Sequence, residues 1–379
     1  MAPVYRLLKT SRGWPWRVRQ AGSDDVPLLA ALAGRLFEEA FAKDNRPEDM
    51  ARYLTENLSA PFLLRELQEP GAQMLLLEQD GEPVGWAHLI PSPAGERGQH
   101  PFQIRRFYVD ARWHGTGASA ALLSAVLQWA RAAGADAVWL GVWEHNRRAQ
   151  AFYRKHGFAP VGRQPFQLGS DLQMDDVLLR PASFGLTLAI VAGGSARRVG
   201  GISKPLLRVE GRPILDRLLD LAPLADEVLL VSSDARLDGW GLRRIEDLLP
   251  DHGAPGGVHA ALAEATQPWV LAVAGDMPFA SGLAVLPLLQ ARSDEVDALA
   301  YTVAGRLEPL LALYRRSLAR PWAAALGRGA PSFRDLWETV RVRQLGEDVL
   351  RWATGDLRAV TSLNTPEDIA RWVQGPPKS

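Results

Sequence analysis

The sequence predicts an α/β protein built from two domains. Its 379 residues fit two domains of ordinary size. In the first half, Asp80-Gly81 indicates a two-residue hairpin turn between two strands, which places antiparallel strands in that domain. In the second half, the apolar run from Leu186 to Ala192 predicts a buried strand that leads into a glycine-rich loop and then a helix. We therefore expect a mixed sheet with helices first, followed by a second α/β domain.

The composition argues against several classes of protein. Lys and Arg number 43, Asp and Glu number 43, and the formal net charge is +0, whereas general nucleic-acid or membrane-surface binders carry a basic excess. The chain has no cysteine, so it forms no disulfide, zinc finger or cysteine nucleophile, which fits a cytoplasmic location. No apolar stretch is long enough to cross a bilayer. We expect neither nucleic acid nor membrane as a partner.

The first domain is expected at residues 16–180, after an N-terminal extension at 1–15 that lacks the apolar core of a signal peptide. Asp24 or Asp25 is a candidate cap for its first helix, through Leu36. The other expected strands are Trp16–Arg19, Gln73–Glu78, Pro83–Leu89, Gln103–Val109 and Trp139–Trp143, and the other expected helices are Pro47–Leu58, Pro61–Leu67 and Ala118–Ala133.

A loop with two glycines joins the strand ending at Val109 to the helix beginning at Ala118. Gly115 and Gly117 expose backbone N–H groups at a helix N-terminus, which suits a pyrophosphate. Arg112-x-x-Gly115-x-Gly117 resembles the acetyl-CoA loop of GNAT acetyltransferases. The segment from Asn146 to Phe158, with its Asn, Ala, Phe-Tyr and Gly-Phe spacing, is similar to the second motif of that family.

This resemblance implies acetyl-CoA as the cofactor of the first domain. The residues that would bind it are Val109, Arg112, Gly115, Gly117 and Asn146. Tyr153 would protonate the departing thiolate, a role that suits a neutral hydroxyl, although packing of the helix against the sheet also explains an aromatic residue there.

The general base and the acceptor of this domain stay open. Glu96, Glu144, His114 or a water chain are candidates for the base. Binding of acetyl-CoA without fast catalysis is an alternative.

Residues 181–185 are expected to link the domains, and residues 186–379 to form the second. Its expected strands are Leu186–Ala192, Glu227–Ser232, Gly241–Ile245, Trp269–Ala274, Asp297–Val303 and Pro309–Tyr314, with helices after Pro213, at Val258–Ala265, at Trp322–Leu326 and after Thr365. Thr365 is a candidate cap for the last helix, with Pro366 at its first position.

The glycine-rich stretch from Val191 to Lys204 is the main candidate site. Its four glycines free backbone N–H groups to converge on an anion, and Arg197, Arg198 and Lys204 supply charge for a triphosphate. It is neither a Walker A loop nor a dinucleotide-binding turn. A plain glycine turn with surface arginines is the alternative.

A second candidate site is Asp276, just past a buried strand and before Met277-Pro278. An aspartate there points toward the same crevice as the glycine loop, and Mg²⁺ binds through one or two carboxylates together with substrate phosphates. A turn or cap role is the alternative.

Together these stretches resemble the molybdenum cofactor guanylyltransferases, nucleotidyltransferases with a Rossmann-like, mostly parallel sheet. The matching segments are Ala-Gly-Gly followed by Arg-Val-Gly and Lys, with departures at Val191, Ala196 and Val199, and then Asp276-Met277-Pro278 and Asn364-Thr365-Pro366-Glu367. The segment Gly253–Val258 resembles the family's glycine-rich loop, which would read a base or sugar edge.

The resemblance implies a set of binding roles. The GTP-binding residues would be Val191, Ala192, Gly193, Gly194, Lys204, Ser232, Asp247 and Asp276. Asp276 would bind Mg²⁺, Arg198 would stabilise the leaving pyrophosphate, and Asn364 would contact substrate. For Asp247 and Asn364, capping of a helix or turn is an equally good interpretation.

The implied reaction is Mg²⁺-dependent transfer of GMP from GTP to molybdopterin, with pyrophosphate release. The implied partners are these small molecules and acetyl-CoA, and contact with molybdoenzymes or cofactor-delivery proteins stays open. Two alternatives remain: a cytidylyltransferase or other nucleotidyltransferase, and an acetyltransferase with a nucleotide-binding module. Gly193-Gly194 favours the guanylyl pattern over the cytidylyl one.

Overall fold

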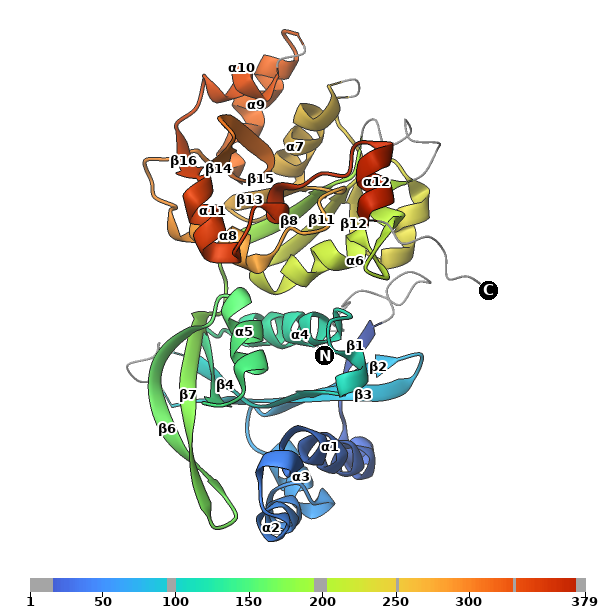
Figure 1. The fold of residues 1–379 in the computed structure, drawn as a ribbon, viewed down its shortest axis with the longest axis vertical. Helices are drawn as coiled ribbons and strands as arrows, with labels where there is room; N and C mark the ends of the chain where they lie inside the picture. Colours follow the sequence, from blue (N-terminus) through green and yellow to red (C-terminus); the bar gives the residue numbers. More distant parts are fainter. Residues whose placement is uncertain (1–15, 94–99, 194–202, 250–251, 330–331, 373–379) are drawn as a thin grey trace. The chain divides into compact units, whose positions relative to one another are not determined.

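The computed structural model describes residues 16–93, 100–193, 203–249, 252–329 and 332–372. These residues form two compact units that divide between Ser183 and Phe184. Each unit contains one seven-stranded sheet flanked by helices (Figure 1). The α/β class predicted from the sequence is confirmed in both units. No helix in the described ranges combines the length and apolarity needed to cross a bilayer.

The N-terminal unit has a mixed sheet in the strand order β1-β2-β3-β4-β5-β7-β6. All neighbouring strands are antiparallel except β4 and β5. The strands are β1 Trp16–Gln20, β2 Gln73–Gln79, β3 Glu82–Pro91, β4 Pro101–Val109, β5 Ala137–Trp143, β6 Ala159–Leu168 and β7 Asp171–Pro181.

The predicted hairpin joins β2 to β3. Asp80 (φ 52°) and Gly81 (φ 88°) both have positive φ, as a tight hairpin turn requires at its two central positions. The long pair β6 and β7 is absent from the sequence prediction. Pro160 and Pro165 interrupt β6, and most of its residues are exposed, so it lacks the apolar alternation that indicates a strand.

Helices cover both faces of this sheet (Figure 1). On one face, Leu29 and Phe37 of α1 pack in a core with Leu76 and Trp86 of the sheet. On the other, Phe152 of α5 packs on the sheet. The helices are α1 Val26–Phe41, α2 Pro47–Asn57, α3 Ala60–Leu67, α4 Ala118–Ala132 and α5 Arg147–Lys155.

The first helix is capped differently from the prediction. Asp25 occupies its N-cap position, but its side chain makes no bond to the helix. The carboxylate instead accepts hydrogen bonds from the Gly22 backbone N–H and the Arg19 guanidinium.

The C-terminal unit has the strand order β12-β11-β8-β13-β15-β14-β16. Neighbouring strands are parallel except where β15 pairs with β13 and β14, so the sheet is mostly parallel, as predicted. The strands are β8 Leu186–Val191, β11 Glu227–Val231, β12 Arg243–Ile245, β13 Trp269–Ala274, β14 Ala298–Val303, β15 Arg306–Arg315 and β16 Val342–Gly346, with a separate short pair of β9 Arg208–Val209 and β10 Arg212–Pro213.

Helices flank this sheet too. α7, α9 and α10 contribute to one continuous core against one face, while Tyr301 on the other side donates a hydrogen bond to the Ala284 carbonyl in α8. The helices are α6 Ile214–Leu218, α7 Gly253–Glu264, α8 Gly282–Gln290, α9 Ala319–Leu326, α10 Phe333–Trp337, α11 Glu347–Thr354 and α12 Pro366–Trp372.

Two helix starts differ from the prediction. Pro213 lies at the N-cap of α6 rather than in its first turn. α7 begins at Gly253, so the segment expected to be a loop up to Val258 is helical. The first turn of a helix needs no N–H from proline, so Pro255 is accommodated there. Gly257 is required by packing, because a Cβ on it would lie 2.8 Å from Cγ1 of Val191.

Candidate functional site

The predicted nucleotide-binding residues that the structure describes lie at the carboxyl edge of the C-terminal sheet. The parallel strands β8, β11 and β13 are in register at Val191, Val231 and Ala274, where all three end. Ligands of such sheets bind beyond the carboxyl ends of the strands. Ala192 and Ser232 follow those ends directly, and Asp276 is the second residue after β13. The backbone N–H of Ala192 donates to the Val231 carbonyl at 2.9 Å.

Lys204, Asp276 and Asn364 meet at this edge. The Lys204 ammonium donates hydrogen bonds to Oδ2 of Asp276 at 2.8 Å and to Oδ1 of Asn364 at 2.7 Å. The side chains of Lys204 and Asp276 are only 12% and 16% exposed, so this ion pair is largely shielded from water. Three residues taken from three separate motifs thus form one polar cluster of an ammonium, a carboxylate and an amide.

The segment that carries Asn364 is fastened to the cluster by its backbone. The N–H of Leu363 donates to the carbonyl of Asp276 at 3.0 Å. Thr365 caps α12, because its hydroxyl accepts from the N–H of Asp368 while the Asp368 carboxylate accepts from the N–H of Thr365. The predicted cap is confirmed, and it fixes the residue next to Asn364.

Ser232 and Asp247 have supporting positions. Ser232 is 2% exposed, and its hydroxyl donates to the Ala192 carbonyl at 3.4 Å and accepts from the N–H of Asp234. The Asp247 carboxylate accepts a hydrogen bond from the N–H of Leu249 at 3.0 Å, as the turn-capping alternative expects. Its carboxylate also lies against Gly256 in α7, where a Cβ would approach it to 2.6 Å.

Part of the predicted loop cannot be placed. Gly193 is described and exposed at the end of the strand, whereas Gly194 and Arg198 lie outside the described residues. Their predicted contacts with the triphosphate stay predictions.

Glu308 is a second acidic residue at this edge that sequence reasoning missed. It lies on β15, which runs antiparallel to β13 and pairs Leu311 with Val273, so the residues before Leu311 run alongside those that follow Val273. Burial raises the pKa of Glu308, the hydrogen bond from the N–H of Leu310 lowers it, and the negative charge of Asp276 raises it again. No motif marks this residue, and only the sheet register brings it to Asp276.

The oxygen atoms here suit a hard divalent cation. Carboxylate and amide oxygens are the protein ligands of Mg²⁺, which also keeps several waters and substrate phosphates. Within the described ranges, no group of three or more His, Cys, Asp or Glu side chains is arranged to hold a metal. An ion at Asp276 would therefore depend on its other ligands coming from substrate and water.

The N-terminal unit contains the predicted acetyl-CoA loop, and Asp110 anchors it. Asp110 is 1% exposed, and its carboxylate accepts from the backbone N–H and guanidinium of Arg112 and from Arg35. These bonds, with Arg112 first, hold its pKa well below the usual range. The guanidinium of Arg112 is thus already engaged in shaping the loop.

The loop geometry suits an anion at the start of α4. Gly115 (φ 77°) and Gly117 (φ 97°) adopt the left-handed backbone conformation that favours glycine, and Gly117 is the N-cap of this 15-residue helix. A ring nitrogen of His114 lies 2.9 Å from the Val109 carbonyl, one of the backbone groups expected near the cofactor.

Asn146 and Tyr153 lie on α5. Oδ1 of Asn146 accepts from the N–H of Ala149 and caps the helix, so any contact with a cofactor falls to its amide nitrogen. Tyr153 is 6% exposed and packs against Phe107, Phe152 and Phe158, as the packing alternative expects. Burial raises the pKa of its hydroxyl, which therefore stays protonated at neutral pH.

Two of the candidate bases, Glu144 and His114, lie within the described residues. Glu144 pairs with Arg163, His114 lies between the Val109 carbonyl and Arg148, and Glu96 is outside the described residues. Burial lowers the pKa of His114, as does the charge of Arg148, so the ring is neutral at pH 7.

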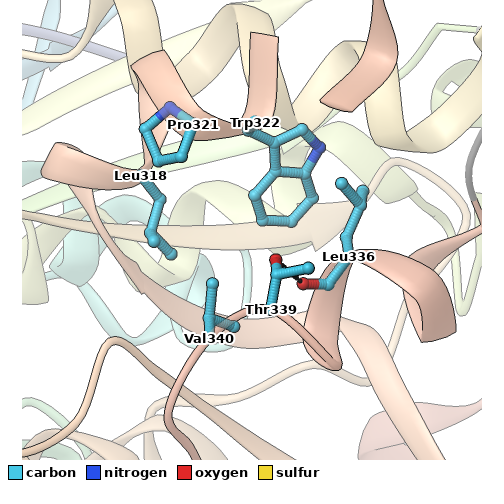
Figure 2. Close-up of a pocket in the computed structure, with 6 residues that line it drawn as sticks. All are labelled: Leu318, Pro321, Trp322, Leu336, Thr339 and Val340. Atoms are coloured by element: carbon cyan, nitrogen blue, oxygen red, sulfur yellow. Dashed lines mark hydrogen bonds between the residues drawn. The ribbon is translucent and has the colours of Figure 1, made fainter. Parts of the chain in front are cut away.

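A separate hollow lies in the C-terminal unit near α9 and α10 (Figure 2). It is lined by Leu318, Pro321, Trp322, Leu336, Thr339 and Val340, and Thr339 donates its hydroxyl proton to the Leu336 carbonyl. With no charged side chain in its lining, this hollow does not suit a triphosphate.

Comparison with known proteins divides the chain in the same way. Residues 35–158 match the acetyltransferase (GNAT) family, and residues 188–344 match the MobA-like NTP transferase domain. An uncharacterized N-acetyltransferase of Mycobacterium bovis is 39% identical over 157 residues, which cover 41% of this chain and 97% of that protein. A molybdenum cofactor guanylyltransferase of Rhodopseudomonas palustris is 34% identical over 194 residues, covering 48% of this chain and 89% of that protein.

The chain belongs to both families. Its GNAT half precedes its MobA-like half, in the predicted order, and both halves belong to enzyme families. Among solved structures, molybdopterin-guanine dinucleotide biosynthesis protein A of Archaeoglobus fulgidus is 26% identical with a TM-score of 0.44, and covers 49% of this chain and 95% of its own.

Proposed function

We propose that the MobA-like half transfers GMP from GTP to the terminal phosphate of molybdopterin in a Mg²⁺-dependent reaction. The convergence of Lys204, Asp276 and Asn364 carries the proposal, because it combines a cation for phosphate with oxygen ligands for a metal. The guanylyltransferases among its relatives support the choice of GTP and molybdopterin.

The reaction needs no nucleophile from the protein. A phosphate oxygen of molybdopterin attacks the α-phosphorus of GTP, the bond from that phosphorus to the bridging oxygen breaks, and pyrophosphate leaves with the electron pair. Bound Mg²⁺ offsets the charge on the phosphate oxygens.

Each residue of the cluster has a defined task in this reaction. Asp276 would hold the metal, with Asn364 and Glu308 as neighbouring oxygen donors. Lys204 exchanges its contact with Asp276 for the phosphates, because its flexible stem and compact charge let it follow them. Since the substrate is already an anion, positioning and charge stabilisation supply most of the rate.

Pyrophosphate release tests this proposal. The full chain is given Mg²⁺ and molybdenum-loaded molybdopterin with either GTP or CTP, and we expect release with GTP and loss of release in Asp276→Asn. Asp294→Asn is the matched control, because this fully exposed carboxylate in the same half lies outside the cluster. Release with CTP alone would contradict the assigned base, and no release with either would reduce this half to a binding module.

For the GNAT half, acetyl transfer from acetyl-CoA to an amine is our proposal. The two positive-φ glycines before α4 fit a pyrophosphate, and the protonated hydroxyl of Tyr153 fits a group that gives a proton to the departing thiolate. Acetyl-CoA binding measured by calorimetry, with Gly115→Val as the disrupting variant, tests the cofactor separately from any acceptor. A bulky β-branched residue at φ 77° should weaken binding, and unchanged binding would remove the loop from the site.

A further inference from the structure

The N-terminal sheet is open between two of its central strands. β4 and β5 pair only over the three residue pairs from Pro101–Ala137 to Gln103–Trp139. Beyond these pairs the two strands no longer bond to each other, although each keeps its other neighbour. Tyr108 of β4 and Trp143 of β5 both lie in this unpaired region, and both side chains pack against Phe41 of α1.

A buried carboxylate lies beside this opening. Asp175 on β7 is opposite Trp143 of β5 and Gln164 of β6. It is 8% exposed, yet no hydrogen bond reaches its carboxylate from any residue in the described ranges. Its Oδ2 lies so close to Gly141 that a Cβ there would approach it to 2.7 Å. A glycine thus makes room for the carboxylate.

No cationic side chain among the described residues pairs with this carboxylate. Burying a charge without a partner is costly, and here burial and the neighbouring Asp176 together raise the pKa of Asp175 to about 6. The nearby Arg106 is held by Glu66 and by the Asn57 carbonyl. Asp175 is therefore mostly ionised at neutral pH, with no counter-ion from the part of the chain that the structure describes.

Aromatic rings surround the same place. Tyr108 and Trp143 both pack against Phe41 of α1, and Tyr53 of α2 packs against Phe166 of β6. Electrostatic interactions connect Asp175 with the hydroxyls of Tyr53 and Tyr108. One carboxylate among aromatic rings is an arrangement that favours an organic cation.

The opening also connects this carboxylate to the other face of the sheet. Tyr108 interacts electrostatically with Asp175 and with Tyr153 of α5. Tyr153 packs on Phe107, the residue before Tyr108, whose side chain is on the opposite face. Tyr108 thus has the proposed proton donor on one side and the unpaired carboxylate on the other.

We propose that Asp175 binds the ammonium group of the acetyl acceptor and takes a proton from it. This inference rests on the proposed acetyl transfer and names the residue that acts as its base. Glu144 and His114, the candidate bases within the described ranges, contact Arg163 and Arg148 instead.

The ammonium gives one proton to the carboxylate of Asp175 and becomes a neutral amine. Its nitrogen attacks the carbonyl carbon of the thioester, a C–N bond forms, the C–S bond breaks, and the thiolate takes a proton from Tyr153. The second proton of the former amine is lost to solvent, Tyr153 recovers its proton, and Asp175 releases its own.

Binding of n-butylammonium to the full chain without acetyl-CoA tests the inference. Calorimetry compares it with n-butanol, a neutral probe of the same length. We expect n-butylammonium to bind at least about tenfold more tightly, to lose that advantage in Asp175→Asn, and to bind more weakly as the pH falls through about 6. Asp171→Asn, an exposed aspartate at the start of the same strand, should leave binding unchanged.

The outcomes separate this inference from the acetyltransferase proposal. Equal binding of the two probes, or undiminished binding in Asp175→Asn, overturns the role of Asp175 even where acetyl-CoA binds and CoA is released. The protein could also bind n-butylammonium through Asp175 and fail to bind acetyl-CoA. That result supports the cation site and contradicts the proposed acetyl transfer. If the rate of CoA release with n-butylammonium falls in Asp175→Asn and no longer depends on pH, the result supports both the role of Asp175 and the acetyl transfer.

Discussion

At the carboxyl edge of the C-terminal sheet, the Asp276 carboxylate accepts a hydrogen bond from the Lys204 ammonium at 2.8 Å. In the opening of the N-terminal sheet, the Asp175 carboxylate is more deeply buried and has no such donor among the residues described. The first charge is neutralised within the protein, and the second is not.

This difference determines which charges a ligand has to supply at each carboxylate. A ligand at Asp276 has to replace an internal partner, so a divalent cation for the carboxylate and phosphates for the ammonium must arrive together. A ligand at Asp175 only has to supply the missing positive charge. An ion pair kept in the free protein lowers the cost of burial, whereas an unpaired charge keeps that cost until substrate binds.

Removing the ammonium should break the first site. We expect Lys204→Ala to lower the rate of pyrophosphate release by about 10²–10³-fold, because a charge aimed at the phosphates is lost. Lys204→Arg should recover little of the lost rate, because a planar guanidinium does not replace the compact charge of an ammonium. Binding of n-butylammonium to the other half is the internal control. Full activity in Lys204→Ala would make this ion pair purely structural.

Removing the second acid of that site should have a smaller effect. We expect Glu308→Gln to raise the Mg²⁺ concentration needed for half-maximal activity by about tenfold, with little change at saturating Mg²⁺. A titration of activity with Mg²⁺ measures this. Glu338→Gln, exposed in the same half, should leave the titration unchanged. An unaltered titration in Glu308→Gln would show that this carboxylate is too far from the ion to assist it.

Replacing the unpaired carboxylate should stabilise the protein. The pKa of Asp175 is raised to about 6 from its usual 3.8, so the folded protein binds this proton more tightly than the unfolded chain. The resulting stability is complete below about pH 4 and is lost as the pH rises through 6. We therefore expect Asp175→Asn to raise the melting temperature at pH 7.5 by about 2–4 °C, the shift given by about 1 kcal/mol, with no gain at pH 4.

Differential scanning calorimetry with Asp171→Asn as the control measures this effect. A lower melting temperature in Asp175→Asn at pH 7.5 would mean that the carboxylate has a stabilising partner inside the fold.

The smallest effect should come from the cap beside Asn364. Thr365→Ala removes the acceptor for the Asp368 N–H and should cost about 1 kcal/mol, seen as faster hydrogen exchange in α12. Thr365→Ser, which keeps the hydroxyl, is the matched control. Unchanged exchange in the alanine variant would show that α12 is held by its other contacts.

Local signals in the sequence were sufficient for most of the fold. β8 and β13 are continuous apolar runs, and Asp80-Gly81 specifies its hairpin, so these elements could be predicted. β6 could not, because two prolines and exposed residues mask it, and its pairing with β7 supplies what its sequence lacks. The start of α7 was misplaced because its glycines and Pro255 are typical of loops.

The two sites differ in how far the sequence could reveal them. Asp276 and Asn364 follow recognisable motifs, and the sheet brings their segments together. Glu308 and Asp175 are single acidic residues within strands, with no motif around them. The significance of each depends on strand register and burial, which a single sequence does not contain.

The hydrogen bonds that join Leu363 to Asp276 and Asn364 to Lys204 also determine when the site can be completed during synthesis. Asn364 lies 160 residues after Lys204, so on the ribosome the ammonium and the carboxylate are made long before the segment that completes their site. Domains generally fold as they emerge, the N-terminal one first. The acetyltransferase half can therefore be folded while the other half still lacks part of its nucleotide site. A prematurely terminated product would keep the first fold and lose the second site.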